Sequence, residues 1–272
     1  MPPMKMPVDW FWTVFLGCAF LCAALALFFF SATRGALLLR SARGTSGAEL
    51  AHVYPLYSNR WLIRLVDFQP LISAILLFQY HRLVSAITAD MRKLDLRDKE
   101  VLITSCAFGN VIRRVVEAAF ESGARRVLIA DLIKNELDHA RSKLQGIPGQ
   151  LEFLEENATA MQQADNSVQV NLIFFLLHEL PHPLKARVLS EAGRVLAPGG
   201  TLYLAEFSRP ELSWLRGLSW AYFKVFEPLG LALWHSHQPL KQLDAIGGFT
   251  CQRKTYFFGN FQIIAATKNG LI

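Results

Sequence analysis

The feature that most limits the fold of this chain is a run of 24 residues, from Trp10 to Thr33, without a charged side chain. Twenty of the 24 are hydrophobic, and about 20 apolar residues are enough for a helix to cross a bilayer. A cleaved signal peptide is the alternative, but its apolar region is typically about 7–15 residues long and ends at a small-residue cleavage site. Because this run is longer and Arg34 follows at once, we expect a retained transmembrane helix over residues 10–33.

The net charge of +6 divides evenly at Gly47. Four basic residues and Asp9 give +3 before Gly47, which leaves +3 for the rest of the chain. Three of these basic residues, Arg34, Arg40 and Arg43, follow the apolar run, so the positive-inside rule predicts an outside N-terminus and a cytoplasmic or matrix-side C-terminal part. Beyond Arg43 no more than two basic residues are adjacent, and we therefore expect no nucleic-acid partner.

From Glu100 onward, short β-rich runs alternate with helical patterns. Strands are expected at 101–104, 126–130, 151–154, 168–177 and 201–207, and helices at 111–122, 132–144 and 184–196. This alternation predicts an α/β fold with a doubly wound, mostly parallel sheet. Two β-rich runs, 254–258 and 261–267, flank the dipeptide Gly259-Asn260, a two-residue hairpin signal. A terminal antiparallel hairpin is therefore expected, with one transmembrane helix preceding the whole domain.

The patterns divide the chain into an anchor over 1–46, a helical lead-in over 47–93 and an α/β domain over 94–272. In the lead-in, the apolar stretch Leu71–Phe78 is too short to be a second membrane span. Within the domain, an insert at about 208–245 is rich in aromatic residues and poor in charge. An aromatic lid suits an apolar substrate at a membrane surface, and ordinary core packing is the alternative.

Charged side chains stand at the ends of two predicted strands, where ligands of doubly wound sheets bind. Asp131 ends the second strand, 22 residues after Gly109, so its carboxylate can accept hydrogen bonds from a ribose; a helix cap is the alternative. His178 and Glu179 follow the central strand. An imidazole there can move a proton near neutral pH, and a carboxylate can orient it or hold a metal. We predict both as catalytic residues, with capping or loop hydrogen bonds as the alternative.

Metal ligands are not fixed by any spacing. His235 and His237 could share one face of an extended segment, but no third ligand accompanies them, and His139 is expected to be solvated. The four cysteines show no metal or disulfide pattern, which suits a reducing compartment.

Two further elements resemble the class I S-adenosylmethionine-dependent methyltransferases. Glu191–Gly200 runs from a helix through Leu-x-Pro-Gly-Gly into a strand, and Gly247–Phe249 precedes the terminal hairpin. Over residues 94–268 the resemblance implies this fold, S-adenosylmethionine as the cofactor, and Asp131 at its ribose. The cofactor-binding residues that it implies are Ser105, Cys106, Ala107, Gly109, Asp131, Leu132, Asn157, Ala158 and Phe174, with Asn157 and Ala158 beside the adenine.

The first loop departs from the superfamily pattern of acid-x-Gly-x-Gly-x-Gly. Ile103 stands at the place of the acid, Ser105 and Ala107 stand at the first two glycines, and only Gly109 matches. Side chains at Ser105, Ala107 and Phe108 are expected to crowd or reshape this loop, because glycine alone lets a backbone approach a ligand closely.

A narrower family shares these departures. The chain resembles the rhodoquinone-biosynthesis methyltransferase-like proteins, relatives of ubiquinone methyltransferases, in Cys106–Asn110, Phe174–Pro181, Phe226–Trp234 and Tyr54–Trp61. The resemblance implies that an amino group from S-adenosylmethionine replaces a ring methoxy of ubiquinone, and that manganese is required. The implied partners are a lipid-soluble quinone and a membrane. Methyl transfer to a quinone or lipid, an inactive scaffold and a lipid-binding module are the alternatives.

Overall fold

The structure, a computed structural model, describes residues 8–31 and 60–270, and the chain divides into two compact units, Met1–Pro55 and Leu56–Ile272. In unit 1 the described part is helix α1 (Val8–Phe30). Its window Phe11–Phe28 has a mean hydropathy of 2.3 and no buried residue, so α1 is long and apolar enough to cross a membrane. A signal sequence near an N-terminus can also meet this criterion of length and hydropathy, and the predicted end of the span at Thr33 lies outside the described residues.

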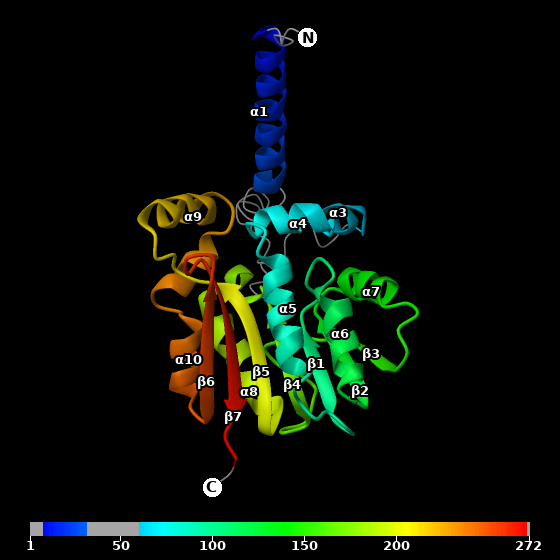
Figure 1. Cartoon of the computed structure of the whole chain (residues 1–272). Coiled ribbons are helices and arrows are strands. Elements are labelled where there is room, and N and C mark those ends of the chain that lie inside the picture. The colour runs from blue at the N-terminus through cyan, green and yellow to red at the C-terminus, as the bar shows by residue number, and fades with distance from the viewer. Residues whose placement is uncertain (1–7, 32–59, 271–272) are drawn as a thin grey trace, which may run out of the picture. The chain divides into compact units, whose positions relative to one another are not determined.

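Unit 2 is built on a seven-stranded sheet in the order β3-β2-β1-β4-β5-β7-β6 (Figure 1). The strands are β1 (Glu100–Thr104), β2 (Arg126–Asp131), β3 (Gln150–Glu155), β4 (Val168–Phe174), β5 (Leu196–Phe207), β6 (Phe249–Tyr256) and β7 (Phe261–Lys268). The first five are parallel, and β7 is antiparallel to both of its neighbours. The predicted fold class is confirmed: crossover connections, most of them helical, join the five parallel strands.

Helices cover both faces of the sheet. The helices of the α/β part are α6 (Val111–Glu121), α7 (Lys134–Lys143), α8 (His182–Val195), α9 (Ser213–Val225) and α10 (Pro239–Ile246), with short 3-10 turns η3 (Leu177–Glu179) and η4 (Pro228–Trp234). Side chains of α6 and α7 pack on one face of the strands, and side chains of α8 and α10 pack on the other. The strands β1, β2 and β4 are buried along nearly their whole length, as expected for strands covered on both faces.

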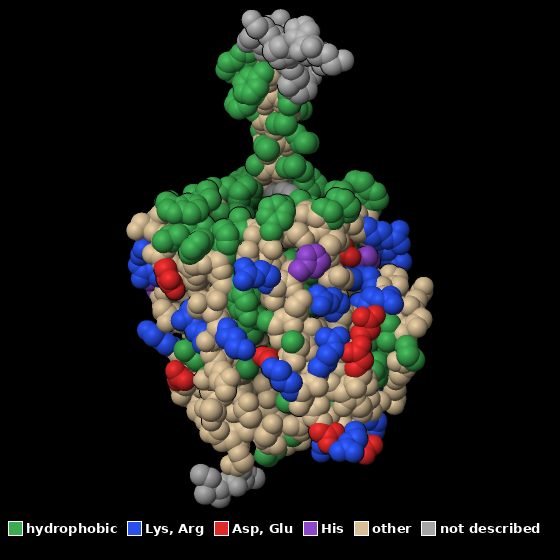
Figure 2. All heavy atoms as spheres, viewed as in Figure 1, with side chains coloured by type: hydrophobic (Ala, Val, Ile, Leu, Met, Phe, Trp, Pro, Cys, Tyr) green, Lys and Arg blue, Asp and Glu red, His purple; other side chains and the backbone are tan. Residues whose placement is uncertain are grey.

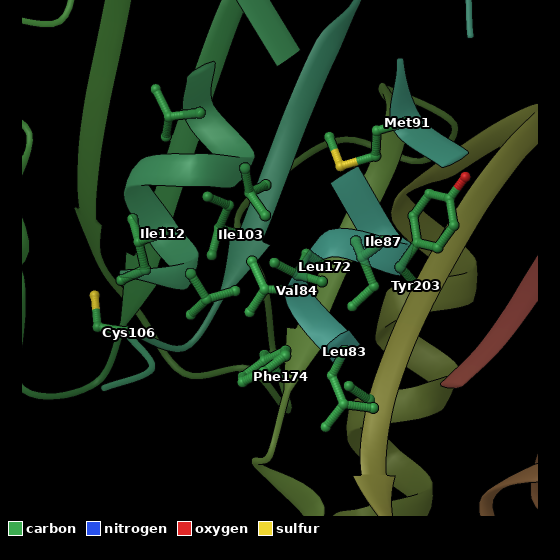
Figure 3. Close-up of a cluster of buried hydrophobic side chains, with 14 of the residues drawn as sticks. Leu83, Val84, Ile87, Met91, Ile103, Cys106, Ile112, Leu172, Phe174 and Tyr203 are labelled. Carbon is green, nitrogen blue, oxygen red and sulfur yellow. The ribbon is translucent and has the colours of Figure 1, made fainter. Parts of the chain in front are cut away.

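The lead-in contributes α3 (Arg60–Val66), α4 (Gln69–Ile75) and α5 (Tyr80–Met91) to unit 2. The apolar side of α5, formed by Leu83, Val84, Ile87 and Met91, is fully buried against side chains of β1, β4 and β5 (Figure 3). Its apolar residues are thus accounted for by the core of unit 2. The axis bends by 96° between α4 and α5.

Two predicted boundaries around the central strand are wrong. The strand expected to reach Leu177 ends at Phe174, because Phe175 takes a φ of 54° and the chain turns into η3. The strand expected to begin at Thr201 begins at Leu196, since Leu196 already pairs with Val168. The Pro-Gly-Gly sequence lies in an irregularity of this pairing, where Gly199 takes a φ of 75°. Apolar composition alone did not separate the strand from the turn that follows it.

The terminal hairpin is present, but its turn is longer than predicted. Tyr256 pairs with Phe261, so the turn has four residues rather than two. Phe257, Phe258 and Gly259 all have positive φ values. The turn is therefore not the two-residue type that Gly-Asn suggests, because two phenylalanines share the left-handed conformation with the glycine.

Candidate functional site

The sheet reverses its order between β1 and β4, and ligands of open α/β sheets bind outside the carboxyl ends of the strands at such a switch point. The structure brings the predicted residues to this edge. Ser105 directly follows β1, Asp131 ends β2 and Phe174 ends β4. His178 and Glu179 lie in η3, just beyond β4. The edge is therefore the candidate site.

Asp131 closes the first loop onto β2. Its Oδ2 accepts hydrogen bonds from the Cys106 backbone N–H at 2.6 Å and the Ser105 hydroxyl at 3.4 Å, and its Oδ1 accepts one from the Ile133 N–H at 2.8 Å. The N-cap of α7 is Ile133, so the capping alternative is not realised. Burial raises the pKa of the Asp131 carboxyl. Oδ2 already accepts two hydrogen bonds and Oδ1 accepts one, so Oδ1 keeps acceptor capacity for a ligand hydroxyl.

The loop after β1 accommodates side chains where the superfamily pattern has glycines. Ser105 adopts a φ of 74°, a left-handed conformation that L-residues rarely take, while Ala107 and Phe108 pack against the core. Gly109 has a φ of 81°, and a Cβ on it would lie 2.4 Å from the Tyr80 hydroxyl. The loop is therefore shaped by packing against the lead-in.

The lead-in also binds the start of α6, a contact that the sequence did not reveal. Asp67, Gln69 and Tyr80 accept hydrogen bonds from three successive backbone N–H groups, those of residues 109, 110 and 111, at 2.5, 3.1 and 2.6 Å. Free N–H groups at a helix start bind anions. Here the side chains of the lead-in already satisfy them.

Asp67 is itself held by two residues of α7. Its carboxylate pairs with His139 Nε2 at 2.8 Å and with Lys143 Nζ at 2.9 Å. Burial opposes ionisation of Asp67, but these hydrogen bonds prevail and lower the pKa of the carboxyl. The expectation that His139 is solvated is wrong, since its side chain is only 16% exposed in this contact.

Acceptors without donors remain near Asp131. Glu136, in the first turn of α7, is 3% exposed, and its Oε1 makes no hydrogen bond. Burial, followed by the charge of Asp131, raises the pKa of Glu136 to about 9. The buried Oδ1 of Asn110 also lacks a donor. Orphan acceptors fit a cationic ligand rich in N–H and O–H donors, as S-adenosylmethionine is, so these residues suit that cofactor.

The loop after β3 holds the residues predicted beside the adenine. Asn157 uses its side-chain oxygen within the loop, accepting the Thr159 N–H and hydroxyl, each at 2.9 Å. Ala158 packs against the core, and Leu132, after β2, is 36% exposed. The Asn157 side chain therefore shapes this loop, while Leu132 offers apolar surface beside Asp131.

His178 is paired with a buried acid on the neighbouring strand. Glu206, in β5, is fully buried and lies 3.1 Å from His178 Nδ1, and it also accepts the His178 backbone N–H at 3.2 Å. Burial alone would lower the pKa of the imidazole, but the Glu206 charge raises it to about 9. His178 is therefore an imidazolium at neutral pH, with Nε2 lying 4.0 Å from the Glu179 carboxylate.

A buried lysine supports the turn that carries His178. Lys185, in α8, is fully buried, and its Nζ donates hydrogen bonds to the carbonyl oxygens of Leu177 and Leu180. Burial lowers the pKa of this amine to about 8. Lys185 lies on the buried face of α8 with Val188 and Leu189. This residue was not predicted from the sequence, although a lysine at the helical spacing of apolar residues indicates a buried amine.

No group of three metal-ligating side chains lies together within residues 8–31 and 60–270. His237 instead stacks on His182, with ring centroids 4.6 Å apart. The described side chains therefore do not fit the manganese site that the family resemblance implies.

The aromatic insert is partly buried and partly exposed. Phe223 and Trp234 are buried with ring centroids 5.7 Å apart, so part of the insert is core. Trp214 and Trp220 are 63% and 51% exposed, as expected for a surface that meets an apolar partner.

Comparison with known proteins agrees with this geometry. Residues 67–243 match the model of the ubiE/COQ5 methyltransferase family. Over 135 residues the chain is 34% identical to the ubiquinone/menaquinone biosynthesis C-methyltransferase UbiE of Klebsiella pneumoniae, covering 49% of this chain and 52% of that protein. The UbiE of Cronobacter sakazakii is 32% identical over 157 residues, which is 57% of this chain and 55% of the relative. The chain thus spans about half the length of the curated relatives it matches.

Solved structures share the fold. A SAM-dependent methyltransferase from Aquifex aeolicus superposes with a TM-score of 0.53 at 18% identity, covering 77% of this chain and 98% of that one. A structure from Methanococcus maripaludis, described as a putative S-adenosyl-L-methionine-dependent methyltransferase, gives 0.52 at 14% identity, over 79% and 95% of the two chains. The family match covers well over half of the chain, so this protein belongs to the ubiE/COQ5 methyltransferase family and has the fold of S-adenosylmethionine-dependent methyltransferases.

Proposed function

We propose that this protein is an S-adenosylmethionine-dependent transferase that modifies the ring of a lipid-soluble quinone. The family membership supports the cofactor, and the printed names of the relatives support a quinone substrate. When bound, the cofactor supplies the group that is transferred. Asp131 would accept hydrogen bonds from its ribose hydroxyls, Leu132 and the loop at Asn157 would flank its adenine, and Glu136 would receive one of its donors.

We further propose that the reaction converts ubiquinone to rhodoquinone by replacing a ring methoxy with an amino group. The buried pair of His178 and Glu206 carries this proposal. An imidazolium can donate a hydrogen bond to a quinone carbonyl, which withdraws electrons from the ring and favours attack by an amine. Replacement of the methoxy would form a C–N bond at the ring as the C–O bond breaks, and the departing methoxide would take a proton and leave as methanol. Transfer of the amino group alone would also break the bond from that nitrogen to its carbon in the cofactor. The quinone ring would take up the two electrons, water would supply an oxygen, and the remainder of the cofactor would leave as a 2-oxo acid, so that the product is an aminoquinol that reoxidises to the quinone.

Methyl transfer is the competing reaction, and it makes the opposite demand on His178. A methyl group that adds to a ring carbon displaces a proton, which an unprotonated base must accept, and His178 would have to be neutral to act as that base. The Glu206 charge holds His178 in its acid form, and this favours amination. Because the described residues do not assemble a metal site, no step is assigned to manganese.

Product analysis tests the proposed reaction. The full chain would be expressed in a host that makes ubiquinone but no rhodoquinone, with methionine carrying heavy nitrogen in its amino group and heavy carbon in its methyl group. Amination predicts a new quinone with heavy nitrogen and one methoxy fewer. A quinone with an added heavy methyl and both methoxy groups would establish methyl transfer instead. No new quinone, with expressed and folded protein, would overturn the enzymatic proposal in favour of a scaffold.

The Glu206→Gln variant tests the role of the pair through its pH profile. Loss of the carboxylate lowers the pKa of His178, because burial then dominates. If the acid form of His178 acts, turnover at neutral pH falls about 100-fold. As the pH is raised, the variant also loses its activity at a lower pH than the wild type does. A profile that instead extends toward acid pH would support a base. Glu121→Gln, which alters an exposed ion pair with Arg92, is the matched control and leaves the profile unchanged.

We also propose that α1 is a retained single-pass anchor, with the N-terminus outside and unit 2 on the cytoplasmic or matrix side. Its length and hydropathy support a span, and Arg34, Arg40 and Arg43 support this orientation. Tethering raises the effective concentration of the enzyme beside a substrate dissolved in lipid.

A further inference from the structure

Helix α9 has apolar residues on its outer side as well as on its inner side. Leu215, Ser219 and Phe223 face the core and are buried. The opposite stripe, at helical spacing i, i+4, i+7 and i+11, consists of Trp214, Leu218, Ala221 and Val225, all of them exposed. The outer stripe of a surface helix in water is normally polar, so this stripe is unusual for a surface that meets only solvent.

The lead-in repeats the pattern. Ile63 and Val66 are the buried residues of α3, while Trp61, Leu65 and Phe68, at i, i+4 and i+7, are 66%, 41% and 60% exposed. Phe78, between α4 and α5, is 75% exposed. Two elements that are far apart in the chain thus present apolar outer stripes.

Figure 2 shows hydrophobic side chains gathered at one end of unit 2, the end that Figure 1 shows to carry α3, α4 and α9. That end is the candidate site's edge, because α9 follows the carboxyl end of β5 and Tyr80, at the start of α5, bonds to the loop after β1. The turn between β6 and β7 joins it, since the Glu211 N–H donates to the Phe258 carbonyl oxygen at 2.9 Å. We call this surface the apolar face, composed of Trp61, Leu65, Phe68, Phe78, Trp214, Leu218, Trp220, Val225 and Phe258.

Charge on the same helices has one sign. Helices α3, α4 and α9 together contain four basic residues and no acidic one, namely Arg60, Arg64, Arg216 and Lys224. Lys224 Nζ lies 5.6 Å from the centre of the Trp220 ring. Tryptophan with lysine and arginine beside aliphatic side chains is the composition of helices that lie in the interface of an anionic bilayer.

We propose that the apolar face docks into the headgroup region of an anionic lipid bilayer and presents the site's edge to the membrane. The bilayer is favoured as the occupant because the basic residues suit anionic headgroups, whereas two like-charged copies of the face would repel each other. Helix α1 adds to this choice, since a chain with a helix of spanning length keeps unit 2 within reach of lipid. The contact is additional to the anchor and does not depend on which reaction the enzyme performs.

Photocrosslinking on the full chain tests the proposal. A diazirine-bearing amino acid would replace Leu218 or Phe78, and a third version would carry it in place of Asp95, an exposed residue before the amino end of β1. Each protein would be reconstituted in vesicles of phosphatidylcholine with phosphatidylglycerol. All three versions keep α1, so anchoring is equal among them. We expect lipid adducts to be at least 5-fold more abundant at Leu218 and Phe78 than at Asp95. This ratio corresponds to a free-energy difference of about 1 kcal/mol.

Lipid labelling at Leu218 and Phe78 no higher than at Asp95 would overturn the docking proposal, as would adducts to a second copy of the chain in place of lipid. In pure phosphatidylcholine vesicles, lipid labelling at both positions should fall. On the vesicles that contain phosphatidylglycerol, the double variant Arg216→Gln, Lys224→Gln should show the same fall in lipid labelling. Labelling that ignores both changes would overturn the anionic preference. These readouts need no turnover, so they succeed or fail separately from the quinone reaction.

Discussion

Asp131 and Glu136 are neighbouring buried acids whose oxygens are used differently. Both oxygens of Asp131 accept hydrogen bonds, so the residue organises the first loop. Glu136 keeps one buried oxygen without a donor, and its raised pKa makes the free protein hold a neutral acid there at neutral pH. A carboxylate that must take up a proton when the chain folds lowers the stability of the protein at neutral pH. Groups with such shifted pKa values cluster at ligand sites.

Glu136→Gln is expected to stabilise the protein at alkaline pH. The folded pKa of about 9 lies above the ordinary 4.5, so the contribution of Glu136 is fully present below pH 4.5 and is lost as pH rises through about 9. Glutamine removes this loss. We expect the free energy of unfolding at pH 8 to rise by several kcal/mol, at most about 1.4 kcal/mol for each pH unit above 4.5, with little change at pH 4.5.

Thermal melts at the two pH values measure this effect, and Glu152→Gln, an acid of β3 on the sheet surface, is the control. A variant that gains equally at both pH values would contradict the raised pKa. Weaker binding of S-adenosylmethionine in the same variant would support the proposed contact with the cofactor.

At the scale of elements, the start of α6 depends on the lead-in. Helix α6 has no side-chain N-cap, and the side chains of Asp67, Gln69 and Tyr80 satisfy the N–H groups at its start instead. Side chains about 30 to 40 positions earlier in the chain therefore accept the hydrogen bonds that an N-cap residue would otherwise accept. The loop after β1, the helix after it and the lead-in therefore form one hydrogen-bonded structure, and the family match includes all three contacting residues of the lead-in.

Tyr80→Phe is expected to destabilise this structure. The substitution removes the acceptor for the Val111 N–H and leaves a buried donor unpaired, which costs about 1–3 kcal/mol. Urea unfolding measures the loss. Tyr203→Phe is the matched control, because Tyr203 lies in the same core and makes no hydrogen bond within the described residues. Equal effects of the two substitutions would show that the hydroxyl of Tyr80 does not cap α6.

The whole molecule joins an apolar helix of spanning length to a unit with an apolar face of its own. As a span, α1 would resist extraction, whereas docking by the apolar face would be sensitive to salt. The two kinds of attachment are therefore separable by experiment.

The wild-type chain is expected to stay in the membrane pellet after alkaline carbonate extraction, with Met1 or Pro2 at its N-terminus by mass spectrometry. The double variant Leu16→Arg, Leu21→Arg places two charges in α1, each costing about 2.5–3.5 kcal/mol at the centre of a bilayer. Alkaline carbonate should release this variant from the membrane. High salt alone should release it as well. Leu16→Ile with Leu21→Ile is the control. A wild-type N-terminus beyond residue 33 would establish a cleaved signal instead.

The sequence by itself determined the strands of the sheet and the helices α6, α7 and α8 in their order, because side-chain periodicity and glycine or proline breaks act over a few residues. It did not predict the helices α9 and α10 of the aromatic insert. It also determined that Asp131 and His178 lie at strand ends. Only the tertiary structure decided their partners: Glu206 is 28 residues from His178, and Asp67 is 42 residues from Gly109. Such pairs are set by strand order and helix packing, which no local pattern encodes. The outward stripes of α3 and α9 likewise became visible only once the fold showed which face the core had used.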